Sequence, residues 1–145
     1  NKSNFDGLDI DMSNLNINNL RISDSRNDCL DLSFGNYNIN NAFLESCTDK
    51  AISVGEKSIF NSETIIAKKS NYALVSKDSS KIFVKKLFSF QNKYCLGASK
   101  KKQEFDGGFI NINSMECKEF SNQSEIDSFS KIILNNKELN LSLNN

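Results

Sequence analysis

Five segments of the chain repeat one pattern of residues at an interval of about 22 positions. They read FDGLDI at 5–10, NDCLDL at 27–32, DKAISV at 49–54, NYALVS at 71–76 and KYCLGA at 93–98. In each segment a large aliphatic residue and a second, mostly apolar residue two positions later alternate with positions that are not consistently apolar. An apolar period of two predicts a strand with one face turned inward.

Residues one repeat apart form columns of similar side chains. The small column contains Gly7, Cys29, Ala51, Ala73 and Cys95, and the aliphatic column contains Leu8, Leu30, Ile52, Leu74 and Leu96. A second strand is predicted from the inward pairs Leu15/Ile17, Tyr37/Ile39 and, after a shift of one residue, Phe60/Ser62, Ile82/Val84 and Ile110/Ile112. A third inward position is predicted at Ile22, Leu44, Ile66, Phe88 and Cys117.

This repeat predicts an all-β fold, a right-handed parallel β-helix of five to six coils with about 22 residues per coil. One repeat cannot bury its own apolar face, so the coils must stack, with equivalent strands paired roughly 4.8 Å apart. A leucine-rich repeat would need its LxxLxLxxN spacing, which the chain lacks. A left-handed hexapeptide helix would have a shorter period, and an antiparallel sandwich would not keep five segments in constant register.

We expect a single β-helix domain over residues 1–145, and a fragment of a larger protein. The coils are expected at about 5–26, 27–48, 49–70, 71–92 and 93–120, followed by a partial coil and cap at 121–145. The segment SKKKQEFDGG before Phe109 is longer than its counterparts and is expected to leave the stack as a loop. Residues 124–134 are expected to form the last partial coil, and residues 138–143 a final strand.

The composition excludes several classes of function. The 18 basic and 18 acidic residues cancel, so the chain lacks the basic surface of a nucleic-acid binder or of a protein drawn to anionic membranes. It contains no histidine, which excludes the usual Ser-His-Asp and Cys-His catalysis and histidine-ligated zinc or haem. No segment is long and apolar enough to predict insertion into a membrane.

Several segments resemble the β-helix repeats of pectate-lyase-like surface proteins. They are NDCLDL (27–32), DKAISVGEKS (49–58), SKDSSK (76–81) and KKQEFDGG (101–108), and the resemblance covers residues 5 to about 134. In particular, the segments look like those that accompany a spore-coat-kinase-like domain in large bacterial proteins. The wider superfamily includes polysaccharide lyases, hydrolases and epimerases, so the resemblance implies a carbohydrate ligand. The epimerase DPHD box is absent.

An acidic patch is predicted on the outside of the first coils. Asp9 and Asp31 occupy one outward column, which places them about 4.8 Å apart. Asp6 and Asp28 occupy the column at the entrance of the strand, and Lys50 follows them one coil later. Stacked carboxylates repel each other, which raises the pKa of one of them unless a cation lies between them. Asp9 and Asp31 could therefore bind calcium, the only cofactor that we consider. Alternatively, Asp9, Asp31, Asp28 and Lys50 could perform acid–base chemistry on a sugar acid, or the aspartates could simply be solvated.

A second candidate site combines a basic loop with aromatic side chains. Lys100, Lys101 and Lys102 are consecutive, and Tyr72 and Tyr94 occupy one column a coil apart. Together these five residues could form a shallow groove in which an anionic polysaccharide stacks on the rings. The alternative is a solvated basic loop beside two exposed tyrosines that form a cross-strand pair.

The four cysteines are expected to be structural and reduced. Cys29 and Cys95 share a column but lie three coils apart, about 14 Å, which is too far for a disulfide. Cys117 is expected to point inward, and Cys47 has no evident partner. The asparagine pairs at 18–19 and 40–41 are one period apart and predict a ladder of hydrogen-bonded amides.

These observations favour a non-catalytic β-helix module that binds, or presents to, polysaccharide within a larger secreted or surface protein. One alternative is a polysaccharide lyase or glycoside hydrolase that uses the acidic patch. Another is a structural spacer or oligomerisation unit. Because the ends of a coil stack expose unpaired backbone, end-to-end self-association or flanking domains are also expected.

Overall fold

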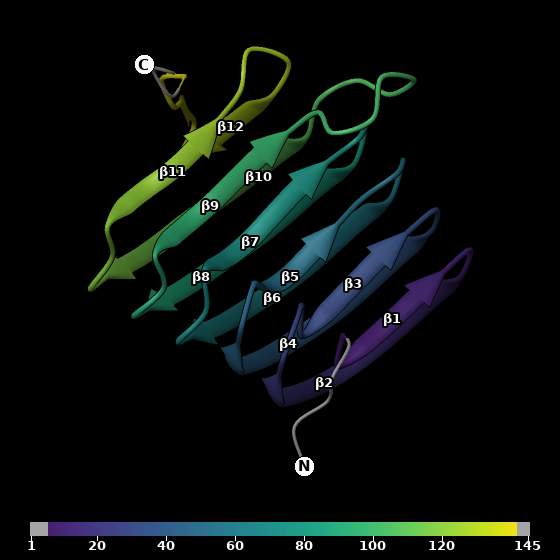
Figure 1. Ribbon diagram of the computed structural model, residues 1–145, viewed down its shortest axis with the longest axis vertical. Helices are drawn as coiled ribbons and strands as arrows, with labels where there is room; N and C mark the ends of the chain where they lie inside the picture. The colour runs from purple at the N-terminus through teal and green to yellow at the C-terminus, as the bar shows by residue number, and fades with distance from the viewer. Residues whose placement is uncertain (1–5, 142–145) are drawn as a thin grey trace.

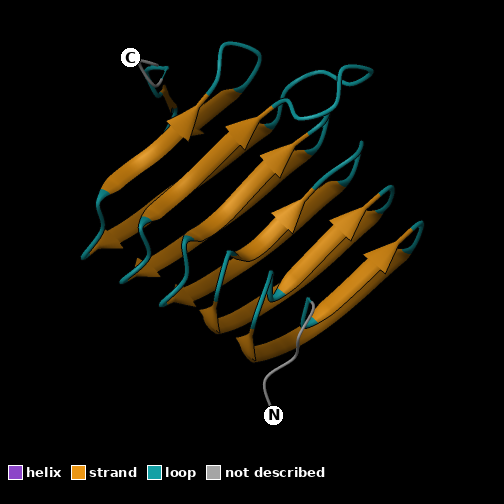
Figure 2. Ribbon diagram, in the orientation of Figure 1, coloured by secondary structure: helices purple, strands orange, loops and turns teal. Residues whose placement is uncertain are grey.

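The computed structural model describes residues 6–141, which form a parallel β-solenoid of about six turns (Figure 1). Each turn contributes one short strand and one long strand, and all described regular structure is β-strand (Figure 2). The short strands form a six-stranded sheet and the long strands a seven-stranded sheet, and the two sheets lie face to face as two layers. No described helix is long and apolar enough to span a membrane.

The two sets of strands have these bounds. The short strands are β1 (Leu8–Asp11), β3 (Leu30–Ser33), β5 (Lys50–Val54), β7 (Tyr72–Lys77), β9 (Tyr94–Ser99) and β11 (Asn122–Ile126). The long strands are β2 (Asn14–Ser25), β4 (Asn36–Cys47), β6 (Ile59–Lys68), β8 (Lys81–Phe90), β10 (Phe109–Lys118) and β12 (Lys131–Leu134), followed by β13 (Lys137–Glu138).

The register of the strands confirms the predicted repeat. Each strand pairs in parallel with its equivalent in the next coil, as in Leu8↔Leu30 of the short sheet and Leu15↔Tyr37 of the long sheet. The predicted shift of one residue falls at the turn before β6, where Tyr37 pairs with Phe60. The chain therefore keeps the same residue columns through a turn of different length.

The core is a narrow column between the two sheets. Leu30, Leu32, Ile52, Leu74 and Leu96 of the short sheet have 0% exposure. The long sheet contributes Tyr37, Ile39, Phe60, Ile82, Ile110 and Ile112, which are also buried. Alternating burial along β4, β6 and β8 leaves every second side chain of the long strands on the outer surface. Both sheets consequently present ordered outer columns.

The third predicted inward column is wrong in two coils. Leu44 pairs with Ala67, which in turn pairs with Ser89, and these two residues are buried. Ile66 and Phe88, which were expected inside, are half-buried neighbours of this column. The one-residue shift that precedes β6 persists to the end of the strand, so the inward position moves with it.

Two other expectations about strands also differ from the structure. The second predicted strand and the third predicted inward position of a coil lie on one continuous strand of 10 to 12 residues in β2, β4, β6, β8 and β10. The final strand expected at 138–143 is limited to β13, which pairs antiparallel with β12, and 142–143 lie outside the described residues. This hairpin covers the last edge of the long sheet.

The loop at 100–107 folds back along one edge of the stack. The backbone N–H groups of Lys101 and Lys102 both donate to Oδ1 of Asp78, at 2.7 and 2.8 Å. The Phe105 ring lies 6.2 Å from the Phe34 ring, at the corresponding turn three coils earlier. The predicted excursion is therefore an ordered cover over the turns that join short and long strands.

The cysteines form two disulfides, so the expectation of free thiols is wrong. Cys29 bonds to Cys47, with Cα atoms 5.3 Å apart, and Cys95 bonds to Cys117, with Cα atoms 6.2 Å apart. Each bond joins the beginning of a short strand to the end of the long strand that follows it in the same coil. One complete coil returns the chain to within one strand spacing of its start, which brings these partners together.

We expect the double variant Cys29→Ala/Cys47→Ala to lose about 3 kcal/mol of unfolding free energy, because the bond restrains a loop of 18 residues in the unfolded chain. Urea denaturation monitored by circular dichroism measures the loss. Peptide mapping under non-reducing conditions should recover both bonded pairs. Titratable thiols in the denatured, unreduced protein would contradict the assignment.

Candidate functional site

The outer face of the short sheet carries the residues that were singled out in the sequence. One outward column runs along the stack as Asp6, Asp28, Lys50, Tyr72 and Tyr94. A second column runs as Asp9, Asp31, Ser53, Val75, Gly97 and Glu125. The face is acidic in the first two coils, and its character changes at Lys50 to aromatic side chains in the fourth and fifth.

Three carboxylates converge at the acidic end. One oxygen from each of Asp6, Asp28 and Asp31 lies within 4.8 Å of the others. The Asp28 backbone N–H donates to Oδ1 of Asp6 at 3.1 Å, and the Lys50 N–H donates to Oδ1 of Asp28 at 3.0 Å. Each carboxylate in this column therefore binds the backbone of the next coil, which fixes its position.

Lys50 closes the acidic cluster on the side of the third coil. Its ammonium nitrogen lies 2.7 Å from Oδ2 of Asp49 and 3.9 Å from Oδ1 of Asp28. Burial opposes the charged form of Lys50, but the hydrogen bond to Asp49 and the charges of Asp28 and Asp49 outweigh it and raise the pKa of Lys50. The ammonium group is thus a permanent cation at neutral pH.

The carboxyl group of Asp31 titrates near neutrality. Burial is the largest cause and raises its pKa to about 7, the charges of Asp28, Asp6 and Asp9 add to the rise, and Lys77 opposes it. Burial also raises the pKa of Asp28, against the effect of Lys50. Asp31 consequently exchanges its proton in the neutral pH range rather than in the acidic range of an ordinary aspartate.

Of the predicted pair of Asp9 and Asp31, only Asp31 belongs to this cluster. The two residues are paired in register, but Asp9 is exposed, and the third close carboxylate belongs to Asp6. Asp6 lies three positions before Asp9, at the entrance to β1. The repeat placed Asp6 in the column of Asp28 and Lys50, but Asp6 was not among the predicted ligands or catalytic residues.

A hollow of about 400 Å³ lies on the same face, beyond Lys50. The Tyr72 and Tyr94 rings stack at 4.6 Å between centroids with 13° between their planes, so the predicted cross-strand pair forms. The Tyr72 hydroxyl donates to Oε1 of Glu125 at 2.9 Å. Burial and this carboxylate both raise the pKa of Tyr72, which keeps its hydroxyl protonated.

Gly97 makes room for this hollow. A Cβ atom at this position would lie 3.2 Å from the Tyr72 ring and 3.3 Å from the Val75 side chain. The remaining polar lining comes from Lys50, Lys101, Glu125 and Asp127. The hollow therefore combines an aromatic wall with two ammonium and two carboxylate groups, a set that can bind a ligand carrying both hydroxyl and carboxylate groups.

The three consecutive lysines of the loop are separated in space. Only Lys101 lines the hollow. The Lys102 ammonium group pairs with Oε1 of Glu56 at 2.9 Å, and the Lys100 ammonium group lies 4.7 Å from the centre of the Phe129 ring. Of the predicted groove of Tyr72, Tyr94 and three lysines, the hollow contains Tyr72 and one loop lysine, joined by Lys50 from the sheet, while Tyr94 packs against Tyr72.

Comparisons of the chain with protein-family models, with curated proteins and with solved structures give no match. The structure is a parallel β-solenoid, and no family or relative supports the resemblance to pectate-lyase-like or spore-coat-kinase-like proteins. The function is therefore inferred from the residues on the outer faces of the short sheet and the long sheet.

The raised pKa of Asp31 predicts that stability falls as pH rises. Between pH 4 and 7 the folded chain holds a proton that an unfolded aspartate, with a pKa of about 3.9, has lost, so each increment of pH favours unfolding until the folded group also ionises. Because Asp31 is partly exposed, solvent screening limits the effect to about 1–2 kcal/mol. Urea denaturation at pH 5 and pH 8 measures it.

The variant Asp31→Asn provides the comparison for this prediction. It should unfold at a higher urea concentration than the wild type at pH 8 and show a smaller loss between pH 5 and 8. A wild-type protein that gains stability over this range, with Asp31→Asn following the same course, would refute the assignment of the proton to this group.

Proposed function

We propose that this chain is a non-catalytic module that binds acidic polysaccharide through the outer face of its short sheet, within a larger secreted or surface protein. The stacked tyrosines beside the hollow carry the proposal. Tyr72 lines the hollow and is held against Tyr94, so its ring offers a fixed surface for the apolar face of a sugar, and the charged groups around the hollow offer partners for the substituents of the sugar.

Lys101 is the group best suited to the carboxylate of a uronic acid. Among the described residues its ammonium group forms no ion pair, whereas the Lys50 ammonium group is already held by Asp49 and Asp28. Glu125 holds the Tyr72 hydroxyl and has a second oxygen that could accept from a sugar hydroxyl. Binding by these groups requires no change in their present contacts.

The disulfides support a location outside the reducing cytosol. Structural disulfides persist in secreted and surface proteins and are rare where thiol reductants are abundant. Polysaccharides that carry carboxylates are common ligands in the same surroundings. The two observations are independent, since the bonds lie at the coil junctions and the hollow lies on the outer face.

The acidic cluster favours a second candidate function, the binding of a divalent cation such as calcium. Asp6, Asp28 and Asp31 can each offer one oxygen within a 4.8 Å span, and hard cations prefer such ligands. Alternatively, Asp31, with a proton near neutrality, could act as a general acid in a lyase or hydrolase. Binding without catalysis is the simpler proposal, because the Asp6 and Asp28 carboxylates already accept backbone N–H groups.

Polygalacturonate is the first probe for the hollow. We expect Lys101→Ala to weaken its binding about tenfold, because a charge-assisted contact contributes about 1.5 kcal/mol or more. Lys100→Ala is the matched control, since it removes the same charge from the same loop outside the hollow. Affinity electrophoresis at constant ionic strength measures both.

Three results would count against the site. Equal losses in Lys101→Ala and Lys100→Ala would indicate diffuse attraction to a basic loop. Binding of polygalacturonate by the wild type, accompanied by its conversion to shortened or unsaturated products, would indicate an enzyme. A complete absence of binding to polygalacturonate would favour the structural spacer.

Calcium binding at the acidic cluster has its own test. At pH 8, where Asp31 is ionised, millimolar calcium should raise the melting temperature of the wild type, and EDTA should reverse the rise. Asp31→Asn should lose the response, while Asp24→Asn, which removes a carboxylate outside the cluster, should keep it. An unresponsive wild type would exclude this candidate.

A further inference from the structure

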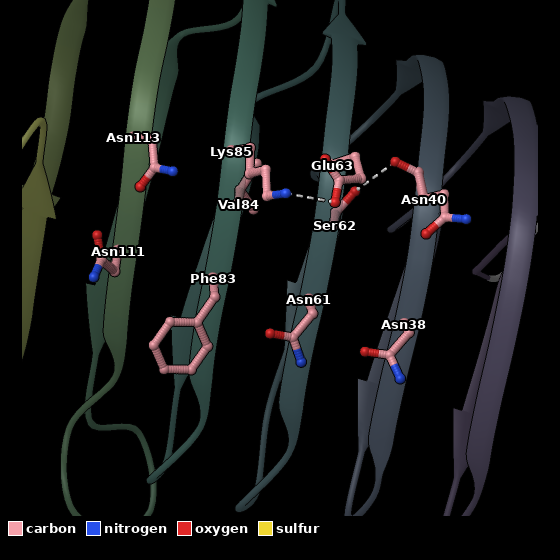
Figure 3. A pocket seen from close by; sticks show the side chains of 10 residues that line it. All are labelled: Asn38, Asn40, Asn61, Ser62, Glu63, Phe83, Val84, Lys85, Asn111 and Asn113. Atoms are coloured by element: carbon pink, nitrogen blue, oxygen red, sulfur yellow. Dashed lines mark hydrogen bonds and ion pairs between the residues drawn. The ribbon is translucent and has the colours of Figure 1, made fainter.

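The outer face of the long sheet carries a second, separate groove. It crosses β4, β6, β8 and β10 and has a volume of about 400 Å³ (Figure 3). Its lower row in Figure 3 consists of Asn38, Asn61, Phe83 and Asn111, one from each strand, and an upper row runs parallel to it. The groove therefore follows the axis of the stack, with one side chain presented per coil in each row.

The asparagines at the β4 end of the groove form their own hydrogen bonds with the preceding coil. The Asn38 amide Nδ2 donates to Oδ1 of Asn16 at 2.8 Å, and Asn40 donates to Asn18 at 3.0 Å. Stacked in this way, an amide binds its neighbour one coil away. Such a ladder is a sufficient structural explanation for the asparagines of the first two coils.

The ladder ends at Asn38, because no described hydrogen bond joins its side chain to that of Asn61 in the next coil. In the fourth coil Phe83 occupies the column of Asn61 and Asn111 and separates these two amides by two strand spacings, roughly 10 Å. The side chains of Asn61, Asn111 and Asn113 form no hydrogen bond with another residue in the described range 6–141. The groove thus contains amides with free donors and acceptors on both sides of an aromatic ring.

The Phe83 ring is available to a ligand. It is 38% exposed and lies 5.9 Å from the Phe109 ring, inclined at 54°. An exposed ring of this kind offers its face to the C–H groups of a sugar, whereas planar amides can bind neighbouring hydroxyls. The strand spacing is also comparable to the length of one sugar unit in an extended glycan, so successive units could meet successive coils.

The charges of the groove select an uncharged ligand. Its charged side chains are Glu63 and Lys85, whose ammonium and carboxylate groups pair with each other at 2.9 Å. Neither group is left to attract an ion, in contrast to the hollow on the short sheet that contains Lys101. We propose that this groove is a binding site for a neutral polysaccharide, on which Phe83 stacks and to which Asn61 and Asn111 donate and accept hydrogen bonds.

The test uses soluble neutral glycans, namely laminarin, mannan and hydroxyethylcellulose, in affinity electrophoresis with the complete chain. At least one should retard the wild type. Phe83→Ala should weaken that binding about tenfold, and Asn61→Ala/Asn111→Ala should do so independently of the ring. Phe90→Ala is a matched control, because Phe90 lies on the same strand with the same 38% exposure and outside the groove.

The outcomes separate this site from the one on the short sheet. Lys101→Ala should leave binding of the neutral glycan unchanged, and Phe83→Ala should leave binding of polygalacturonate unchanged. Failure of all three glycans to retard the wild type would overturn the proposal, as would equal losses in Phe83→Ala and Phe90→Ala. Thermal melts of each variant identify a loss of folding, and if Phe83→Ala fails to fold, the double asparagine variant decides the question.

Discussion

Parallel pairing of each strand with its equivalent in the next coil determines where the side chains of the two sheets lie. The pairing stacks similar residues, which favours a continuous apolar column inside but brings similar polar groups together outside. Amides accommodate this by bonding to one another, as Asn38 does to Asn16. Carboxylates repel, and Asp28 and Asp6 accommodate this by accepting backbone N–H groups from the following coil, whereas Asp31 does so by retaining a proton near neutrality.

Residue columns were predictable because they depend only on a constant repeat. The inward pairs of the two sheets, the stacked tyrosines and the asparagine ladder follow directly from it. Ile66 and Phe88 were misplaced because an extra residue before β6 moves every later position of the strand, and apolar character does not distinguish Ile65 from Ile66. The disulfides were missed for a different reason. Each bond joins two residues of the same coil, whereas the predicted columns compare residues of different coils.

The two outer faces differ in how their character arises. The long sheet presents regular outer rows of side chains, and its groove contains one change of residue type within an asparagine column, Phe83 between Asn61 and Asn111. The hollow on the short sheet needs tertiary information, since Gly97 creates the space and the loop supplies Lys101. Three consecutive lysines are indistinguishable in sequence. Asp78 and Asp127 accept hydrogen bonds from the backbone N–H groups of these lysines, and the anchored lysine side chains contact different neighbours. Local anchoring therefore selects which lysine can take part.

The position of the disulfides also determines how the chain would respond to a pulling force. Because each bond closes a coil on itself, the segments from Cys29 to Cys47 and from Cys95 to Cys117, with sequence separations of 18 and 22, cannot extend when the ends are drawn apart. At about 3.5 Å per extended residue, roughly 140 Å of contour length is withheld from the stretched chain. Under a pulling force the outer coils and the middle of the stack would thus unravel while two covalently closed turns persist.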